Sequence, residues 1–482
     1  MQHYETKPED RIPFLGKIIY GLGGFVNNLL AYAIGSMVIV LNLGLGMNPA
    51  LVGLLGALPR LTDSITDPIM GYISDNTRSR WGRRRPYIFC GAILSGLCFA
   101  LLWQLPRGES ESYYFLYFLI GSLIFYLAYT MFATPWVAFG YEMTPDYHER
   151  TRLMGTQNFI AQLAYVIGPW FLLFMQNENY FDDMVDGAAG LSILIAAAVI
   201  VIGVTPALFL RERLQDIASQ EAESSHQHEP SSMGKIIMAN MRDFFSGFWE
   251  ALKVKPFLKL CLATFLIFNG FILVASLQAY VVIYYVFNGD TLAGAEYAGY
   301  EGSLRAISTF GIIVLITWLA TRIGKRRTLM LTTAVSMVGY ASKWFLYNPE
   351  MPWLIMIPAP LIAFGFGGLF TLAPAMMADV VDYDETTSHE RREGMFGSIF
   401  WWVVKLGQAV AIAGGGLILN ATGFDVDLGE QSSQTIHTMR LFDAFVPVVT
   451  SAIAIWAIWS FSLTEEKAHE IRAQLEKTRG TA

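Results

Sequence analysis

The chain has 482 residues, of which 54% are hydrophobic and only 15% charged, and its formal net charge is −7. A soluble protein would carry about 25% charged residues, so the composition excludes an ordinary soluble domain. The negative net charge and the lack of a long basic tail argue against nucleic acid as a partner. The expected partner of so apolar a chain is the lipid bilayer.

The hydrophobic residues are grouped in segments of about 20 residues or more, the length that crosses a bilayer. We predict twelve such segments, and hence an all-α integral membrane protein. The polar stretch before the first segment and the length of that segment argue against a cleaved signal peptide. The segments span residues 14–43, 50–74, 87–105, 113–140, 153–176, 189–210, 257–287, 297–321, 328–347, 353–378, 394–420 and 441–463.

Lys and Arg residues gather in alternate loops between these segments. With a cytoplasmic amino terminus, the predicted outer loops contain only Arg107 and, at the edge of the last segment, Arg440, and all the basic clusters fall inside. This asymmetry places both termini in the cytoplasm. We expect a multi-pass protein of the plasma membrane, the inner membrane in a bacterium, acting as a monomer.

Two loops repeat one pattern, which indicates two related halves. The turn after the second segment reads Arg80-Trp-Gly-Arg-Arg-Arg85, and the turn after the eighth reads Arg322-Ile-Gly-Lys-Arg-Arg327. A repeat at this interval predicts two six-helix bundles. We predict a first bundle at 1–214, a cytoplasmic middle loop with an amphipathic helix at 215–256, a second bundle at 257–464 and a cytoplasmic tail at 465–482. The amphipathic helix either lies at the membrane interface or merely tethers the seventh segment.

Two aspartates, Asp63 and Asp67, stand one helical turn apart inside the second segment. A carboxylate at membrane depth costs a few kcal/mol or more, and an i,i+4 pair shares one helix face. Such a pair is suited to hold a cation. The alternative is a structural ion pair, for instance of Asp63 with Arg60 or Lys405.

The stretch from Asp63 to Pro86 resembles the signature of the glycoside-pentoside-hexuronide:cation symporters, the melibiose permease group of the major facilitator superfamily. Similar motifs follow in order along almost the whole chain. They are Tyr129-Thr130 with Pro135-Trp136, Asp146 to Leu153, and Ala378-Asp-Val-Val-Asp-Tyr383 leading to Val404-Lys405. The resemblance implies twelve helices in two pseudo-symmetric bundles and cation-coupled sugar symport by alternating access.

The resemblance also implies a cation site for Na⁺, Li⁺ or H⁺. Its acidic pair matches Asp63 and Asp67, and the accompanying hydroxyl and amine match Thr130 and Lys405. Hard oxygen ligands of this kind suit Na⁺, whereas two carboxylates that share a proton suit H⁺. We expect the coupling ion alone, with no further cofactor.

The sugar site departs from that of the melibiose permease. The three charged sugar-binding positions of that protein match Asn28, Ala133 and Asn158, so a melibiose-like galactoside is not implied. Neutral glycosides and uronides both remain open. Candidate substrate-binding residues are the amides Asn27, Asn28, Asn158 and Gln162, the aromatic residues Phe370 and Trp401, and Arg305. The alternative for each amide is a hydrogen bond between helices, and for each aromatic residue simple packing.

Arg305 lies in the eighth segment, four residues after Glu301. We favour an i,i+4 ion pair between the two. The sharper hypothesis is that Arg305 faces the cavity and binds an acidic group of the substrate, such as a uronide.

Acidic and basic residues at the inner helix ends are candidates for gating ion pairs that break when the bundles move. Asp75 and Arg84 are favoured because their loop recurs in the second half. The other candidates are Glu142, Arg150, Asp379 and Asp382. The alternative is ordinary solvated loop charge, which stabilises little.

Other classes of function were weighed against sugar symport. An enzyme is not expected, because the seven histidines are scattered through loops and tails without a metal or nucleophile pattern. A carrier of a non-sugar substrate such as a lysolipid, or an exporter, is the serious alternative.

Overall fold

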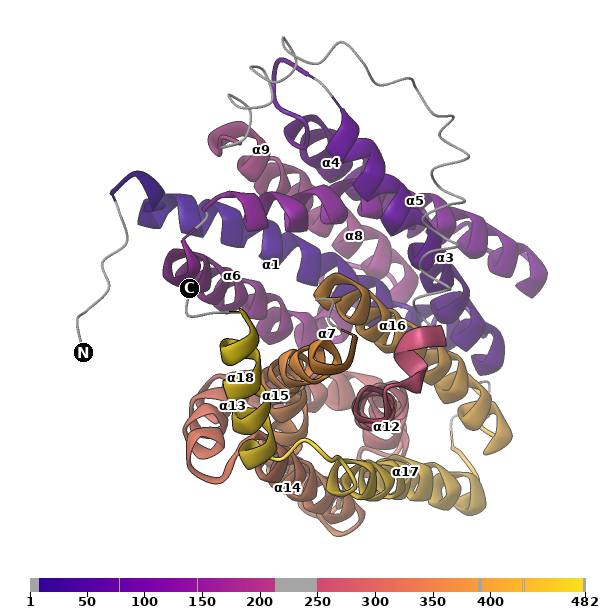
Figure 1. The fold of residues 1–482 in the computed structure, drawn as a ribbon. Helices are drawn as coiled ribbons and strands as arrows, with labels where there is room; N and C mark the ends of the chain where they lie inside the picture. Colours follow the sequence, from indigo (N-terminus) through magenta and orange to yellow (C-terminus); the bar gives the residue numbers. More distant parts are fainter. Residues whose placement is uncertain are drawn as a thin grey trace. The chain divides into compact units, whose positions relative to one another are not determined.

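The computed structural model describes residues 8–77, 79–144, 146–212, 249–388, 392–426, 428 and 430–479, and all regular structure in these ranges is helical (Figure 1). The chain divides into two compact units, one of Met1–Met47 and Leu58–Ser231, the other of Asn48–Ala57 and Ser232–Ala482. Most of the predicted middle loop, with its amphipathic helix, lies outside the described residues.

The first unit is built on long helices joined by short connections. In it α1 packs along α6 and α8, and α4 packs along α5 and α8. Its helices are α1 (Phe14–Met37), α2 (Ile39–Leu43), most of α3 (Pro49–Asn76), α4 (Arg85–Leu102), α5 (Glu111–Glu142), α6 (Tyr147–Ile167), α7 (Phe171–Met175), α8 (Met184–Gly203) and α9 (Thr205–Phe209).

The second unit repeats these pairings six segments later. Here α12 packs along α16 and α17, and α14 packs along α15 and α17. In both units the first helix of the six packs along the fifth and sixth, and the third packs along the fourth and sixth. This shared packing agrees with the repeat in the loops. The helices are α12 (Lys255–Val281) with a π-helical end (Val282–Val286), α13 (Thr291–Ile323), α14 (Lys325–Leu346), α15 (Pro358–Ser388), α16 (Glu393–Ala421), α17 (Ser433–Trp459) and α18 (Glu465–Arg479).

Each predicted segment falls on a helix or on consecutive helices, and the largest error in a start is at the last one. We predicted a start at residue 441, but α17 begins at Ser433. Its first turns contain Gln434, Thr435 and His437, which hide the helix from a hydrophobicity pattern. Ser432 caps it, since the Thr435 amide donates a 3.1 Å hydrogen bond to Ser432 Oγ, and such a cap satisfies an amide that the helix itself cannot.

Aspartates in two predicted outer loops begin helices. Asp183 Oδ1 accepts 2.9 Å hydrogen bonds from the amides of Val185 and Asp186 at the start of α8. Asp290 Oδ1 likewise accepts from Leu292 and Ala293 at the start of α13. These carboxylates also lie at the positive end of the helix dipole.

Ten helical spans among the described residues are long and apolar enough to cross a membrane. α3 and α14 are not among the ten. The apolar part of α3 ends at Thr62, before the aspartates, and α14 contains many hydroxyl residues and Lys343. Charged and hydroxyl side chains lower the hydrophobicity of α3 and α14 below that of the ten spans. Several of these side chains take part in the sites described below.

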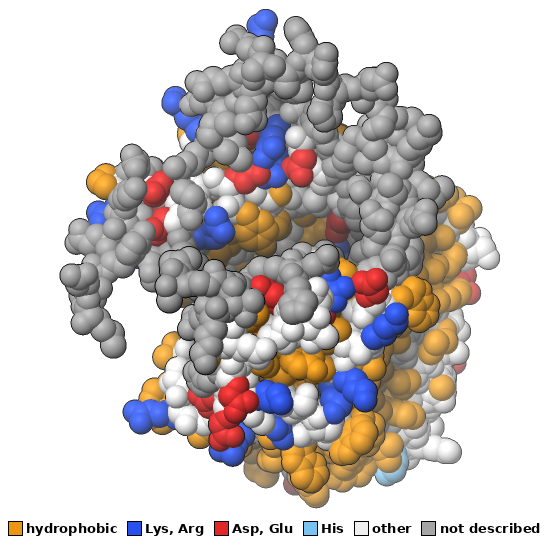
Figure 2. Space-filling view, in the orientation of Figure 1, with side chains coloured by type: hydrophobic (Ala, Val, Ile, Leu, Met, Phe, Trp, Pro, Cys, Tyr) orange, Lys and Arg blue, Asp and Glu red, His pale blue; other side chains and the backbone are white. Residues whose placement is uncertain are grey.

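One face of α17 shows where lipid is expected. Large exposed hydrophobic side chains recur along it at helical spacing, and Figure 2 shows hydrophobic side chains covering the lower right flank where α17 lies in Figure 1. A soluble protein would place polar residues there. The exposed residues are Leu441, Phe445, Val449, Ile453, Trp456 and Trp459.

Candidate functional site

Asp67 on α3 meets two threonines on α5. The hydroxyl groups of Thr130 and Thr134 each donate a 3.2 Å hydrogen bond to the same oxygen, Asp67 Oδ1. Thr130 is only 2% exposed, and Asp67 is half-buried. The two threonines are one turn apart, so they present both hydroxyls on one face of α5. The structure thus brings together Asp67 and Thr130, two of the four residues predicted for the cation site.

Two members of this oxygen cluster were missed by the sequence analysis. Thr134 is the second hydroxyl on Asp67, and Thr66 Oγ1 lies 3.4 Å from Thr130 Oγ1. The i,i+4 spacing of Thr130 and Thr134 was a signal that could have revealed Thr134. Together the four side chains offer hard oxygen ligands from two helices, the donor type that Na⁺ shares with other hard cations.

The two other residues predicted for the cation site are Asp63 and Lys405. Asp63 belongs to α3, but its side chain lies outside the described residues. Lys405 lies on α16 in the second unit.

The predicted amides of α1 connect helices. Asn28 Nδ2 donates a 3.1 Å hydrogen bond to the carbonyl of Ala161 on α6. The Tyr129 hydroxyl donates to Asn27 Oδ1 at 2.8 Å, and Tyr129 precedes Thr130, a predicted cation ligand, on α5. Asn28 thus has the interhelical role that was the alternative for it, whereas Asn27 links α1 to the turn of α5 that contacts Asp67.

The predicted amides of α6 differ from those of α1. Asn158 is exposed and Gln162 is half-buried, and neither side chain is hydrogen-bonded to another part of the described chain. Polar side chains of this kind keep both donor and acceptor available to a ligand.

A row of aromatic rings crosses the second unit and includes both predicted aromatic residues. Phe271 on α12 packs on Phe366 of α15 with ring centroids 4.6 Å apart, and Phe366 packs on Phe370 at 4.7 Å. Phe370 stacks on Trp401 of α16 at 6.4 Å with an interplanar angle of 24°. Phe370 is 37% and Trp401 is 49% exposed, so this end of the row presents accessible flat surfaces.

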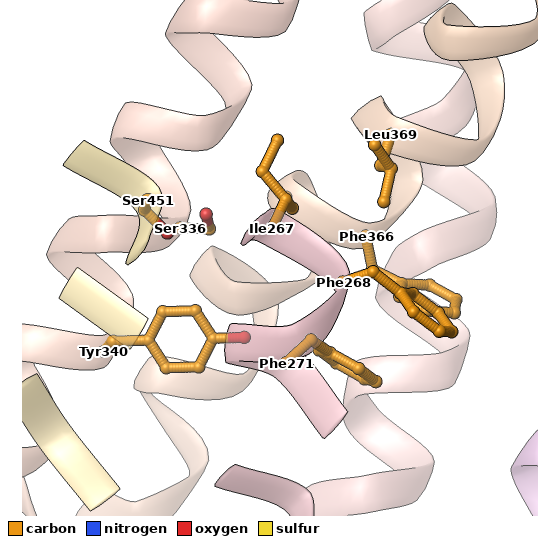
Figure 3. A pocket seen from close by; sticks show the side chains of 9 residues that line it. Ile267, Phe268, Phe271, Ser336, Tyr340, Phe366, Leu369 and Ser451 are labelled. Atoms are coloured by element: carbon orange, nitrogen blue, oxygen red, sulfur yellow. The ribbon is translucent and has the colours of Figure 1, made fainter. Parts of the chain in front are cut away.

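The inner end of the row lines a narrow pocket with room for about one water molecule. Figure 3 shows rings on one side and hydroxyl groups on the other. The lining residues are Ile267, Phe268, Phe271, Ser336, Tyr340, Gly365, Phe366, Leu369 and Ser451.

Arg305 lies beside this pocket and is paired. Its Cζ lies 5.6 Å from the centre of the Phe271 ring, within cation–π range. Its Nη1 donates a 3.1 Å hydrogen bond to Glu301 Oε1, while Gln278 Nε2 donates to Glu301 Oε2 at 2.8 Å. The i,i+4 pair that we favoured is therefore present, and Gln278 holds the second carboxylate oxygen.

A second buried ion pair lies close to the first. Lys343 Nζ on α14 is 2.6 Å from Asp443 Oδ2 on α17, and their side chains are 1% and 2% exposed. Lys343 also interacts electrostatically with Glu301 and Arg305. Asp443 was not predicted from the sequence, because its partner stands 100 residues away. We call Glu301, Arg305, Lys343 and Asp443 the charge quartet; its formal charges cancel.

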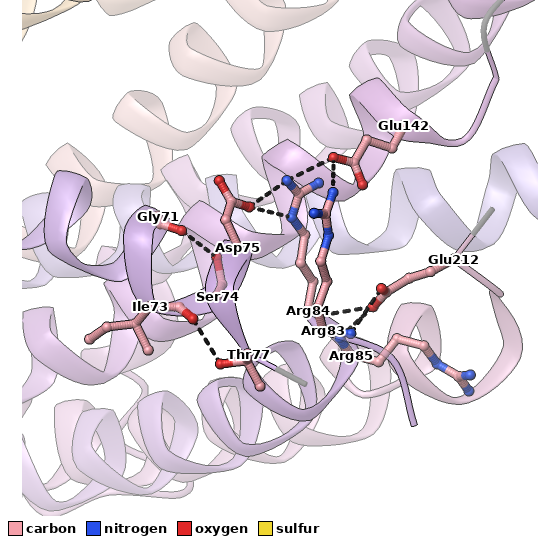
Figure 4. Close-up of polar contacts among 10 residues, drawn as sticks. All are labelled: Gly71, Ile73, Ser74, Asp75, Thr77, Arg83, Arg84, Arg85, Glu142 and Glu212. Atoms are coloured by element: carbon pink, nitrogen blue, oxygen red, sulfur yellow. Dashed lines mark hydrogen bonds and ion pairs between the residues drawn. The ribbon is translucent and has the colours of Figure 1, made fainter. Parts of the chain in front are cut away.

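At the end of α3, the favoured gating pair is formed. Arg84 donates to Asp75 Oδ1 through Nη2 at 2.6 Å and Nε at 3.2 Å, and Arg84 Nη2 also lies 2.9 Å from Glu142 Oε1 (Figure 4). Arg83 donates to Glu142 as well. Burial lowers the pKa of Arg83, but the bond to Glu142 and the charges of Asp75 and Glu212 outweigh it, so the pKa lies above its usual range.

Glu212 fixes the loop that carries these arginines. Its carboxylate accepts hydrogen bonds from the backbone amides of Arg83, Arg84 and Arg85 at 2.9, 2.8 and 3.1 Å. Gly82 in this loop has φ +104°, and a Cβ there would lie 2.5 Å from Glu212 Oε1. Glycine is therefore required both by the left-handed backbone and by the approach of the carboxylate.

The remaining gating candidates have other partners. Asp379 on α15 binds Lys325 at 2.7 and 2.8 Å, and Arg150 donates a 3.1 Å hydrogen bond to the Thr144 carbonyl rather than to an acid. Asp382 is half-buried on α15. Asp384, which was not among the predicted gating residues, binds Arg392 through both oxygens at 2.7 and 2.9 Å.

Residues 19–465 match the model of a family described as MFS/sugar transport protein. The chain belongs to this family. The MFS/sugar transport proteins are transporters rather than enzymes, and the fold is that of the major facilitator superfamily. Membership of this family confirms the resemblance that the sequence motifs indicated. The helices long and apolar enough to span a membrane agree with a transporter of this family.

Relatives of this MFS/sugar transport protein include several with named substrates. The glucuronide carrier protein homolog of Escherichia coli is 24% identical, with 95% of this chain and 94% of the relative covered. The isoprimeverose transporter of Lactiplantibacillus pentosus is 24% identical over 94% and 93%. The sodium-dependent lysophosphatidylcholine symporter 1 of Mus musculus is 22% identical over 99% and 91%.

Among solved structures, a bacterial homologue of the human lysosomal transporter Spinster is similar in fold. The TM-score is 0.65 at 14% sequence identity, with 99% of this chain and 100% of that chain covered. At this identity the likeness describes the fold alone.

Proposed function

We propose that this transporter couples the movement of a cation to the symport of a sugar or glycoside by alternating access. The observation that carries the proposal is the oxygen cluster on α3 and α5, where Asp67 accepts hydrogen bonds from Thr130 and Thr134. An ionisable side chain in a membrane helix most often marks an ion pathway. The carboxylate and its hydroxyls would bind the coupling ion, together with Asp63.

The ligand set favours Na⁺ over H⁺ as that ion. Protonation needs only the carboxylate, whereas Na⁺ needs several oxygen ligands at once, and Thr66, Thr130 and Thr134 supply hydroxyl oxygens beside Asp67. Lys405 would compete with the ion for the acids, as the family resemblance implies. The coupling free energy expected between ion and substrate is about 1–3 kcal/mol.

The names of the relatives and an aromatic surface in the second unit both favour a sugar or glycoside as the substrate. The names of the glucuronide carrier homologue and the isoprimeverose transporter refer to sugar derivatives. Phe370 and Trp401 provide a flat exposed surface for the apolar face of a sugar ring. Asn27, Asn158 and Gln162 would hydrogen-bond the hydroxyl groups.

We further propose the organisation expected from the loops. It consists of two bundles at 1–214 and 257–464, a cytoplasmic middle loop at 215–256, both termini in the cytoplasm, and a monomer in the inner membrane. The pairs of Asp75 with Arg84 and of Asp379 with Lys325 would then lie at the inner ends of the helices. They would act as gates that open and close with alternating access.

The test is uptake into proteoliposomes that contain the purified protein. Sugars and glycosides are offered at fixed pH with an inward Na⁺ gradient, with an inward H⁺ gradient, and with neither. We expect accumulation against the sugar gradient only when Na⁺ is present outside. Accumulation that is independent of both ions would contradict cation coupling, and accumulation with H⁺ alone would reassign the ion.

A lysolipid is the second candidate substrate, favoured by the name of the sodium-dependent lysophosphatidylcholine symporter among the relatives. Lysophosphatidylcholine offered in the same vesicles separates the two. Uptake of the lysolipid with no uptake of sugars would replace the first candidate.

A further inference from the structure

Arg440 on α17 is held by side chains of two neighbouring helices, α12 and α14, which both pack along α17. Its Cζ lies 3.8 Å from the ring centre of Tyr285, at the π-helical end of α12, and 4.6 Å from that of Trp344 on α14. Both distances are within cation–π range. Arg440 Nη2 also donates a 2.7 Å hydrogen bond to the Trp344 carbonyl. These three contacts fix the position of the guanidinium.

Most hydrogen-bond donors of this guanidinium stay available. Arginine has five N–H donors, and in Arg440, which is half-buried, only Nη2 is hydrogen-bonded to another part of the described chain. No carboxylate among the described residues pairs with it. Arg305 and Lys343 of the charge quartet, and Arg107, each have an acidic partner. A fixed guanidinium without a counter-charge is suited to bind an anion, and its planar fork matches the geometry of phosphate.

The place of Arg440 along α17 is that of a membrane interface. The turns before it are mostly polar, and the apolar run begins directly after it, at Leu441. The exposed side chains of Leu441 and Phe445 begin the face on which lipid is expected, and Phe445 packs on Trp344 with ring centroids 5.6 Å apart. Tyrosine and tryptophan rings are typical of the headgroup layer of a bilayer. The depth of Arg440 is therefore that of lipid phosphates.

We propose that Arg440 binds the phosphate group of a phospholipid, whose acyl chains lie along the exposed face of α17. The guanidinium fork binds the phosphate oxygens, and the chains cover Leu441 and Phe445. An anionic phospholipid is preferred, because a zwitterionic one carries its own compensating cation. In the proposed topology the lipid belongs to the outer leaflet. This site is additional to the proposed transport function and does not depend on it.

The test measures lipid binding to the purified protein in detergent micelles. Dioleoylphosphatidylglycerol, dioleoylphosphatidylcholine, dioleoylglycerol and inorganic phosphate are titrated separately, and the melting temperature is recorded. Both phospholipids should raise it, phosphatidylglycerol at the lower concentration. Dioleoylglycerol lacks the phosphate and inorganic phosphate lacks the chains, so each should have little effect. For Arg440→Gln we expect the phosphatidylglycerol concentration at half of the effect to rise about tenfold or more.

A comparison with and without lipid separates binding from stability. Arg440→Gln also loses the contacts with Tyr285 and Trp344, so its melting temperature should fall even without lipid. A merely structural role would lower the melting temperature equally in both conditions, whereas loss of the site reduces the difference that phosphatidylglycerol makes. Arg440→Lys keeps the charge without the fork and should give an intermediate response. If Arg440→Gln does not fold, the weakened response of Arg440→Lys decides the question.

Arg107→Gln is the matched control, because Arg107 lies on the same predicted side of the membrane but is paired with Asp183 and Asp186. It should leave the response to phosphatidylglycerol unchanged. An unchanged response in Arg440→Gln would overturn the inference. An equal effect of dioleoylglycerol would also overturn it, since the chains alone would then be bound. An equal effect of inorganic phosphate would overturn it as well, because the site would then bind a free anion and not a lipid.

Discussion

Lys343 and Asp443 form an ion pair of 2.6 Å that joins α14 to α17 inside the second unit, with side chains only 1% and 2% exposed. Such a pair stabilises little more than apolar side chains of the same volume, because both charges must leave water. Loss of one partner is different, since it leaves a buried charge without compensation.

Asp443→Asn is therefore expected to lower the free energy of unfolding by about 3–5 kcal/mol. The measurement is thermal unfolding of the purified protein in detergent micelles. The double variant Lys343→Met with Asp443→Leu removes both charges and should lie much closer to the parent. Equal destabilisation by the single and the double variant would contradict this account.

Asp67→Asn is expected to abolish cation-driven accumulation while leaving some facilitated exchange of the sugar. The amide oxygen still accepts hydrogen bonds from Thr130 and Thr134, so the helices stay in contact, but the negative charge that attracts the ion is gone. Asp290→Asn is the matched control, because asparagine caps a helix as well as aspartate does. Full accumulation by Asp67→Asn would refute the assignment of the cation site.

Thr134→Ala tests the residue that the sequence analysis missed. If Thr134 is a ligand, its loss should raise the Na⁺ concentration for half-maximal uptake by about tenfold, as for one hydrogen bond to a charged group. Thr134→Ser restores the hydroxyl and should recover most of the affinity. An alanine variant with unchanged Na⁺ dependence would show that Thr134 only orients Asp67.

The contact of Arg84 with Asp75 can be measured by a double-mutant cycle. Arg84 is 6% exposed and Asp75 50%, and two bonds join them. Arg84→Gln and Asp75→Asn, singly and together, should show a coupling energy of about 0.5–3 kcal/mol in unfolding. The exposed pair of Arg107 with Asp186 provides a comparison, and a smaller coupling energy is expected there because water screens the two charges. If the pair is also a gate, breaking it should change the rate of sugar exchange.

Glu149 predicts a dependence of stability on pH. Burial raises the pKa of this carboxyl, but the bonds from Lys17, the Ile12 amide and Arg152 outweigh it, so the pKa lies below the usual range. A lowered pKa in the folded state means that the carboxylate stabilises the fold above the ordinary glutamate value of about 4.3. That stability is lost as the pH falls through the lowered value.

Melting temperatures measured between pH 7 and pH 3 check this expectation. Glu149→Gln should be less stable than the parent at pH 7 by about 1–3 kcal/mol, and the difference should shrink as the solution becomes acidic. A difference that is constant over this range would mean that packing, and not the charge, is responsible.

The resemblance between the halves could be followed from sequence into structure. Basic turns after the second and eighth segments predicted a repeat, and the pairings of α1 with α6 and of α12 with α16 agree with it. Hydrophobic runs located the helices because apolar length is a local property. The polar start of α17 at Ser433 escaped, since a helix that extends beyond the apolar run is held by its cap and has no hydrophobic pattern.

The amino-acid sequence by itself determined the class of the protein, its membrane helices, and the place of Asp67 and Thr130 in two motifs of one family, because composition, periodicity and motifs are local properties of the chain. The tertiary structure alone decided which distant side chains meet. It brought Thr134 to Asp67, Asp443 to Lys343, and Arg305 with its paired Glu301 to the aromatic row that ends at Trp401. These contacts join residues on different helices, and no local pattern records them, because helix packing brings them together only when each chain segment has been placed against its neighbours.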